Sequence, residues 1–169
     1  PAAQGLYLPR FEHDACGVNF VCHLRGEASH GIVDYGIAAL CNLQHRGALG
    51  AEENTGDGAG ILMQVPDRFY REIVEFDLPA PGQYATGLSF LPSDPAEAAD
   101  AALFLEALAS DEGLRVLGWR DVPTESSALG SAASAVQPVI RQLFLSSATD
   151  RAAAGIGLDR LVYPFRKRA

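Results

Sequence analysis

The chain has 169 residues, enough for one domain whose core buries roughly two thirds of the surface of the unfolded chain. Hydrophobic residues make up 48% of it and charged residues 20%, and no apolar run approaches the roughly 20 residues of a membrane-spanning helix. The net charge of -8 and the pI near 4.9 argue against nucleic acid or a membrane as partner, because both require clustered Lys and Arg. These numbers predict one soluble domain.

Three cysteines, Cys16, Cys22 and Cys41, occur without the CxxC spacing of a metal or redox motif. Their odd number argues against a disulfide framework, and a reducing cytosol fits best. The first fifteen residues lack a basic region followed by an apolar core, so they do not resemble a secretory signal. We therefore expect a cytoplasmic protein with an irregular leader at residues 1–15.

The first half of the chain predicts the order strand, helix, loop, strand, helix. Apolar residues alternate over 18–24, as in a half-buried strand. Ser29 is a suitable N-cap for the helix that follows, in which apolar residues recur at spacings of three and four. A glycine-rich stretch at 47–60 leads to a second strand at 61–65, and Pro66 opens a short helix.

The second half predicts further strands around one alanine-rich helix. That helix is expected at about 94–110, because alanine has the highest helix propensity. The small and polar residues at 126–135 indicate a mobile loop, and 150–169 is expected to hold a short helix followed by a strand. The predicted strands of this half are 84–90, 114–119, 139–145 and 161–165.

Two motifs carry the functional signal. HDACGV, residues 13–18, precedes the first predicted strand, and NLQHRGALGAEENTGDGAGIL, residues 42–62, follows the first predicted helix. Together with the VPDRFY that comes next, they resemble the class II glutamine amidotransferases, which are N-terminal-nucleophile hydrolases. The likeness is greatest to the amidotransferase domain of glutamate synthases, because related families have a CG start and an HRG segment without the TGDGAG extension.

The chemistry of such a family explains a cysteine at the start of a strand. A thiol that attacks a carboxamide needs a base. When cysteine is the first residue, its own α-amino group, with a reference pKa of about 7.7 to 8.0, accepts the thiol proton without a histidine partner. The nitrogen of an internal cysteine is tied up in a peptide bond, so the bond between Ala15 and Cys16 has to be cut.

The resemblance implies that residues 1–15 are a propeptide, removed when the Cys16 thiol attacks the preceding carbonyl group. Residues 16–169 then correspond to the N-terminal portion of the amidotransferase domain. In the mature domain, the sulfur of Cys16 would attack the side-chain amide of glutamine, release ammonia and leave a γ-glutamyl thioester that water hydrolyses.

The same resemblance assigns supporting roles to three other residues. Arg46 matches the arginine of the HRG segment beside the nucleophile, where a guanidinium favours thiolate over thiol, so we expect it to be catalytic with Cys16. Gly47 matches as well, and its missing side chain would let the backbone approach the cysteine. Asp57 lies in the glycine run that shapes the turn into the second predicted strand, and an aspartate between glycines is first of all a turn former.

Other interpretations of these residues are weaker. Cys22 and Cys41 fall on apolar faces and are expected in the core. No pair of cysteines or histidines has the close spacing typical of a tetrahedral zinc site. The GxGxG run precedes a strand and does not link a strand to a helix, which argues against a bound nucleotide. His23 and His30 are expected to be structural or solvated. We therefore expect no metal and no cofactor within this segment.

Part of the family's site has no counterpart in the sequence. In the family, a later segment supplies an Asn-Gly pair for the oxyanion hole, with an arginine and an aspartate that hold the α-groups of glutamine. The asparagines here, Asn19, Asn42 and Asn54, are not followed by glycine. Each missing oxyanion donor costs roughly 10²–10³-fold in rate, so we expect these residues alone to be a poor glutaminase. The FMN and the iron-sulfur cluster implied for complete glutamate synthases have no counterpart here either.

We predict an α+β fold, part of the four-layer α/β/β/α sandwich of the N-terminal-nucleophile hydrolases. The implied function is hydrolysis of L-glutamine to supply ammonia for glutamate formation from 2-oxoglutarate. The implied partners are the rest of the glutamate synthase chain and a small FAD/NADPH subunit. One alternative is a stand-alone N-terminal-nucleophile amide hydrolase, which would not need other segments to bind its substrate. Another is an inactive regulatory or binding module that keeps the fold and its uncut leader.

Overall fold

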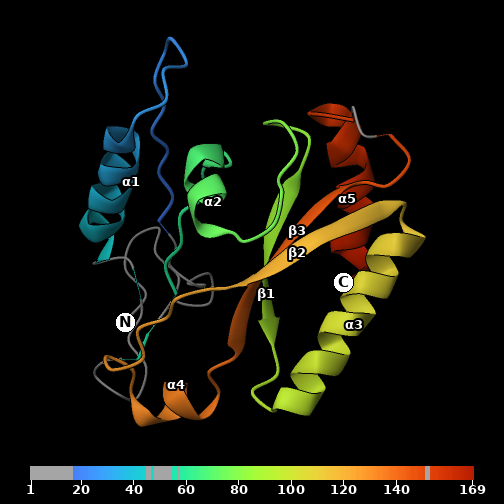
Figure 1. The fold of residues 1–169 in the computed structure, drawn as a ribbon. Coiled ribbons are helices and arrows are strands. Elements are labelled where there is room, and N and C mark those ends of the chain that lie inside the picture. Colours follow the sequence, from blue (N-terminus) through green and yellow to red (C-terminus); the bar gives the residue numbers. More distant parts are fainter. Residues whose placement is uncertain (1–16, 45–46, 48–54, 57, 151–152) are drawn as a thin grey trace, which may run out of the picture. The chain divides into compact units, whose positions relative to one another are not determined.

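A computed structural model describes residues 17–44, 47, 55–56, 58–150 and 153–169 (Figure 1). The chain forms two compact units. Unit 1 comprises residues 1–63 and 128–133, and unit 2 comprises residues 64–127 and 134–169. Helices and strands both occur, so the fold is mixed α and β.

Unit 2 is built on a three-stranded antiparallel sheet. Its strands are β1 (Ala85–Leu91), β2 (Leu114–Asp121) and β3 (Val139–Ser147). The spatial order is β1-β3-β2, and β3 pairs antiparallel with both neighbours. The two outer strands therefore run parallel to each other, which requires a long connection between them.

Helix α3 (Pro95–Asp111) makes that connection. The Asp94 carboxylate accepts hydrogen bonds from the backbone N–H groups of Ala96 and Glu97, at 2.9 and 3.0 Å, so it caps groups that have no partner within the helix. Gly113, with a φ of +73°, turns the chain from the end of the helix into β2.

Helices α3 and α5 (Ile156–Arg168) cover one face of the sheet, and α2 (Asp67–Ile73) lies on the other (Figure 1). Successive side chains of β3 point to opposite faces of the sheet, as in any pleated strand. Leu143 and Leu145 point towards α3 and α5. The buried residues of this main core are Leu108, Ala109, Leu114, Leu143, Leu145, Leu158 and Phe165.

The opposite face of the sheet is organised by Phe144, whose side chain is fully buried. Its ring makes edge contacts with Tyr70 of α2 and with Phe76, at centroid distances of 5.1 and 5.3 Å. Tyr84, just before β1, stacks on it at 6.2 Å. Such aromatic contacts add to the stabilisation that comes from buried area alone, so this cluster fixes α2 and the segment after it onto the sheet.

Unit 1 contains α1 (His30–Asn42), which begins after Ser29 as the sequence predicts. The short helix α4 comprises Ser131–Ala135. A Cβ atom added to Gly36 of α1 would come within 2.9 Å of the side chain of Ile61. The missing side chain of Gly36 therefore lets the segment around Ile61 lie against the helix.

Two strands predicted in the first half of the chain are wrong. Residues 18–24 and 61–65 belong to neither helix nor strand, and the side chains of Val18, Phe20 and Leu24 are 89%, 88% and 97% exposed. An alternating apolar pattern forms a strand only when a neighbouring strand accepts and donates its backbone hydrogen bonds. Within the described part of the chain, neither segment has such a neighbour.

The elements predicted in the second half agree better with the structure. The short helix after Pro66, the alanine-rich helix and the strands at 84–90, 114–119 and 139–145 are confirmed within a few residues. The strand at 161–165 is wrong, because α5 spans it. The buried residues of that segment follow a spacing of three and four, which is helical. The loop at 126–135 is wrong in part, because it includes α4.

None of the helices in the described ranges is long and apolar enough to cross a membrane. The same ranges contain no cluster of three His, Cys, Asp or Glu side chains able to hold a metal ion.

Candidate functional site

The predicted site residues lie mostly outside the part of the chain that the structure describes. Cys16, Arg46 and Asp57 fall in undescribed positions. Gly47 is described and exposed, and its backbone N–H donates a hydrogen bond to the carbonyl oxygen of Gln44 at 3.2 Å. A Cβ on Gly47 would make only an ordinary contact, 3.6 Å, with that oxygen. The proposed reason for a glycine here, close approach to Cys16, therefore stays a prediction.

One described residue from each motif meets the other. The side chain of Leu43 packs against Gly17, and a Cβ on Gly17 would lie 2.9 Å from its nearest methyl carbon. Gly17 directly follows Cys16, and Leu43 opens the segment that contains the HRG motif. The structure therefore brings the residue after the predicted nucleophile against Leu43, near the start of the second motif.

Helix α1 is the common support for this part of unit 1. Its C-cap residue, Leu43, donates backbone hydrogen bonds to the carbonyl oxygens of Ala39 and Leu40, at 3.2 and 3.0 Å, which fixes the place where the HRG segment leaves the helix. Gly36, earlier in the helix, leaves room for the side chain of Ile61, which follows the TGDGAG run. The helix and its C-cap residue thus lie against residues of both motifs.

The expected core positions of two cysteines are wrong. Cys22 and Cys41 are free thiols and both are exposed. The predicted apolar faces that carried them are not covered by other described residues, since the partner strand of 18–24 is missing from those residues. Both thiols are therefore accessible to solvent, which makes them useful controls for reactivity at Cys16.

The two described histidines each lie beside a carboxylate four residues along the chain. His23 Nδ1 accepts a hydrogen bond from the backbone N–H of Glu27, at 3.1 Å. Its Nε2 lies 3.8 Å from the side-chain carboxylate of Glu27. His30 lies 3.4 Å from Asp34 on the exposed face of α1. These contacts agree with the expected structural or solvated roles.

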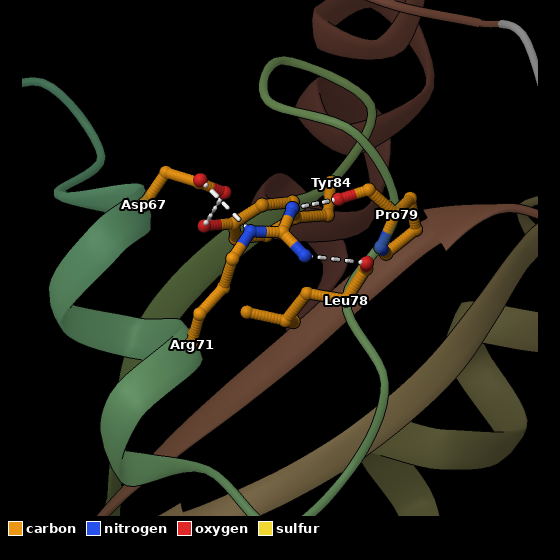
Figure 2. Close-up of polar contacts among 5 residues, drawn as sticks. All are labelled: Asp67, Arg71, Leu78, Pro79 and Tyr84. Atoms are coloured by element: carbon orange, nitrogen blue, oxygen red, sulfur yellow. Dashed lines mark hydrogen bonds and ion pairs between the residues drawn. The ribbon is translucent and has the colours of Figure 1, made fainter.

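A polar cluster around Arg71 was not expected from the sequence (Figure 2). Arg71 Nε donates to Asp67 at 2.9 Å, and its terminal nitrogens donate to the carbonyl oxygens of Leu78 and Pro79. The Tyr84 hydroxyl donates to the other oxygen of Asp67 at 3.1 Å. The hydrogen bond from Arg71 lowers the pKa of Asp67. Together these hydrogen bonds connect α2 to the turn before β1, which gives the cluster a structural role.

A second polar chain crosses the sheet face below α2. Arg120 donates to the side-chain oxygen of Gln142 at 3.1 Å, and the amide nitrogen of Gln142 donates to the Tyr70 hydroxyl at 2.7 Å. Gln142 is buried, so both hydrogen bonds are needed to offset its desolvation. No sequence pattern connects these three residues, because they come from α2, β2 and β3.

Unit 2 also has a shallow hollow of about 370 Å³, lined by residues such as Asp121, Thr124, Ser134 and Gln137. Asp121 is paired there with Arg141, at 3.0 Å. The lining residues that the structure describes belong to neither motif, so the hollow adds nothing to the motif-based site.

Comparison with known proteins decides the family. Residues 16–169 match the family described as glutamine amidotransferases, class II. The chain belongs to this family. The match covers all but the first fifteen residues, and an amidotransferase domain of this class accounts for both motifs at once.

Relatives of the chain include glutamate synthases. It is 41% identical to the large chain of glutamate synthase [NADPH] from Bacillus subtilis, over the whole chain and 11% of that protein. It is 42% identical to glutamate synthase [NADH] from Schizosaccharomyces pombe, over 84% of the chain and 7% of the relative. It is 37% identical to ferredoxin-dependent glutamate synthase 2 from Synechocystis sp., over 90% of the chain and 10% of the relative. The chain thus spans about a tenth of the length of these relatives.

Proposed function

We propose that these residues form the opening part of the amidotransferase domain of a glutamate synthase large chain, with Cys16 as the nucleophile. One observation carries the proposal: the match to the class II glutamine amidotransferases begins at Cys16. The 41% identity to the Bacillus subtilis large chain over the whole of the sequence supports the choice of glutamate synthase within that family.

In this proposal, residues 1–15 are a propeptide. The thiol of Cys16 attacks the carbonyl carbon of Ala15, the acyl group moves from nitrogen to sulfur, and water cleaves the resulting thioester. Cleavage releases residues 1–15 with a new carboxylate and leaves Cys16 with a free α-amino group and a free thiol. That amine is the base that the mature enzyme needs.

Glutamine hydrolysis then follows in two stages. The α-amino group of Cys16 takes the thiol proton, and the thiolate attacks the side-chain amide carbon of glutamine. The tetrahedral intermediate collapses with transfer of the proton to the leaving nitrogen, which departs as ammonia. Water attacks the γ-glutamyl thioester, glutamate leaves and the thiol is restored, so that glutamine and water become glutamate and ammonia.

The residues around the nucleophile take the roles that the motif implies. Arg46 stabilises the thiolate electrostatically, Gly47 leaves room for the backbone beside it, and Asp57 shapes the turn after the second motif. The packing of Leu43 against Gly17 supports this arrangement, because it holds the start of the second motif next to the residue that follows Cys16.

We infer the four-layer α/β/β/α sandwich as the fold of the complete domain. The sheet of unit 2, with α3 and α5 on one face, supports this inference because a sheet covered by a helical layer is one half of that arrangement.

The remaining parts of the active site and the use of ammonia require residues outside this sequence. We infer that later residues supply the oxyanion hole and the glutamine pocket, and that the FMN and iron-sulfur centres lie elsewhere in the large chain. Ammonia made at Cys16 would react with 2-oxoglutarate there, with electrons from a small FAD/NADPH subunit. A thiol nucleophile works only when reduced, which favours a cytoplasmic enzyme.

The mass of the purified complete protein tests the proposal. Wild type and a Cys22→Ala control should both begin at Cys16, whereas Cys16→Ala should keep residues 1–15, because its side chain cannot attack the preceding carbonyl group. Cys22 is a fitting control, because it is an exposed thiol six positions away. A glutaminase that retains residues 1–15 and is unaffected by Cys16→Ala would contradict the proposal.

A further inference from the structure

Gly17, the residue after Cys16, has no room for a side chain. A Cβ atom on Gly17 would lie 2.9 and 3.1 Å from the two methyl carbons of Leu43 and 3.2 Å from its Cγ. The backbone of Gly17 does not itself call for glycine, because its φ lies outside the left-handed region. Close packing against Leu43 is therefore the steric reason for a glycine at this position.

Leu43 is able to hold Gly17 because its own backbone is fixed at the end of α1. Its N–H group donates hydrogen bonds to the carbonyl oxygens of Ala39 and Leu40, at 3.2 and 3.0 Å. Its side chain is half-buried, and Cγ as well as both methyl carbons approach Gly17. The contact thus involves the whole branch of a side chain whose backbone is held in place.

The residues that follow Gly17 contribute little to holding this end of the chain. Val18 and Phe20 are 89% and 88% exposed, and residues 18–23 belong to no helix or strand. The Cα atoms of neighbouring residues are about 3.8 Å apart across a trans peptide bond, so a contact that fixes Gly17 limits where the backbone of Cys16 can lie.

We propose that Leu43 is a positioning residue for the reaction at Cys16. By packing on Gly17, it keeps the thiol and the α-amino group of Cys16 beside the HRG segment. Leu43 acts through Gly17 and does not touch the reacting atoms. The inference rests on the proposed function and adds to it a residue on which the rate depends, because a misplacement of about 1 Å costs an enzyme about 10²-fold in rate.

Steady-state kinetics of glutamine hydrolysis by the complete protein test this role. Expression with Met directly before Cys16 lets removal of that Met expose the α-amino group, so that the variants do not depend on self-processing. Leu43→Ala should lower kcat roughly 10- to 100-fold and leave KM unchanged, because a loosely held nucleophile slows the chemical step and not the binding of glutamine. Leu43→Met, which keeps the volume of the side chain, should retain the wild-type kcat.

The matched control is Leu40→Ala. Leu40 is also a half-buried leucine of α1, one turn before Leu43, and the substitution removes the same atoms. Both truncations should lower the melting temperature, whereas only Leu43→Ala should lower kcat. A wild-type kcat in Leu43→Ala, or an equal loss of kcat in Leu40→Ala, overturns the proposal.

An exchange of side-chain size tests the contact itself and does not rely on Leu43→Ala alone. Gly17→Ala should lower kcat, because its new Cβ meets Leu43. The double variant Gly17→Ala/Leu43→Ala should be faster than Gly17→Ala, because it removes the carbons that the new Cβ meets. Losses of kcat that multiply in the double variant would show that the two residues act independently, which contradicts the proposal.

Cys16→Ala, measured in parallel, separates this inference from the proposed function. If Cys16→Ala keeps its glutaminase activity, the proposed function fails, and the role of Leu43 fails with it. If Cys16→Ala is inactive while Leu43→Ala has the wild-type kcat, only the positioning role of Leu43 fails.

Discussion

At the scale of single residues, Gly118 is the most closely packed of the described glycines in unit 2, and it lies against the ring of Phe76. A Cβ atom on Gly118 would lie 2.4 to 2.8 Å from three carbons of the ring. The ring is itself held by Phe144, so it has little room to move away. The glycine therefore fits the bulge of β2 beneath the aromatic cluster, a constraint that no sequence motif announces.

We predict that Gly118→Ala lowers the free energy of unfolding by about 1–3 kcal/mol, the usual cost of overpacking. Urea unfolding measures it. Gly87→Ala on β1 is the control, because a Cβ there has no neighbour within 4 Å. Equal effects of the two substitutions would show that the ring of Phe76 does not restrict Gly118.

Tyr84 gives a prediction for alkaline pH. Its burial and its hydrogen bond to Asp67 raise its pKa to about 12, from 10.0 for an ordinary tyrosine. The folded chain therefore keeps this proton at a pH where the unfolded chain has lost it, so the stability contributed by Tyr84 is complete below pH 10 and is lost as the pH rises from 10 to about 12.

Tyr84→Phe should lower stability by about 0.5–1.5 kcal/mol at neutral pH, because it removes one hydrogen bond, and should weaken the alkaline loss. Urea midpoints at neutral and alkaline pH measure both effects. Tyr163→Phe, at an exposed position of α5, should leave both unchanged. An alkaline loss of the same size in Tyr84→Phe as in wild type would contradict the account.

At the scale of elements, α3 depends on its cap. Asp94 satisfies two backbone N–H groups at the start of the helix, and the helix packs on both outer strands of the sheet. Asp94→Ala should lower the free energy of unfolding by about 0.5–2 kcal/mol. Asp100→Ala, an exposed change of the same kind inside the helix, should not destabilise the chain. Thermal or urea unfolding separates them, and equal losses would mean that the cap is not the cause.

How far each element could be predicted from the sequence depends on where its partners lie. The helix after Asp94 was predictable because its cap and its alanines are local signals. The segments 18–24 and 61–65 have the composition of strands, yet a strand forms only with a neighbour, and the described residues provide none. In 161–165, apolar composition suggested a strand, but the spacing of the buried side chains makes it part of α5.

In the candidate site too, some residues could be predicted from the sequence and others could not. Cys16 and Arg46 were predictable because the motif HDACGV and the HRG segment are specific residue patterns. The contact between Gly17 and Leu43 depends on how the chain leaves α1, and the chain from Tyr70 through Gln142 to Arg120 joins three elements far apart in the sequence. Contacts of this kind follow from tertiary packing and leave no local signal.

At the scale of the whole molecule, stability should be uneven. β3 is hydrogen-bonded on both sides and lies at the centre of the core, whereas residues 18–23 belong to no helix or strand. Hydrogen exchange followed by mass spectrometry should therefore find the slowest amides in 139–147 and the fastest among 18–23. Protection of 18–23 equal to that of β3 would show that this segment is paired in solution.

The central claim is that Cys16 is the nucleophile of a class II glutamine amidotransferase. Labelling the complete, processed protein with the glutamine-like electrophile diazo-oxo-norleucine tests it most directly, because attack by the catalytic thiol leaves a stable thioether. Peptide mapping should find the label on Cys16, at the start of the mature chain, and none on the exposed thiols Cys22 and Cys41. A label on either of those two, or an unlabelled Cys16 in a protein that the reagent has inactivated, would contradict the account.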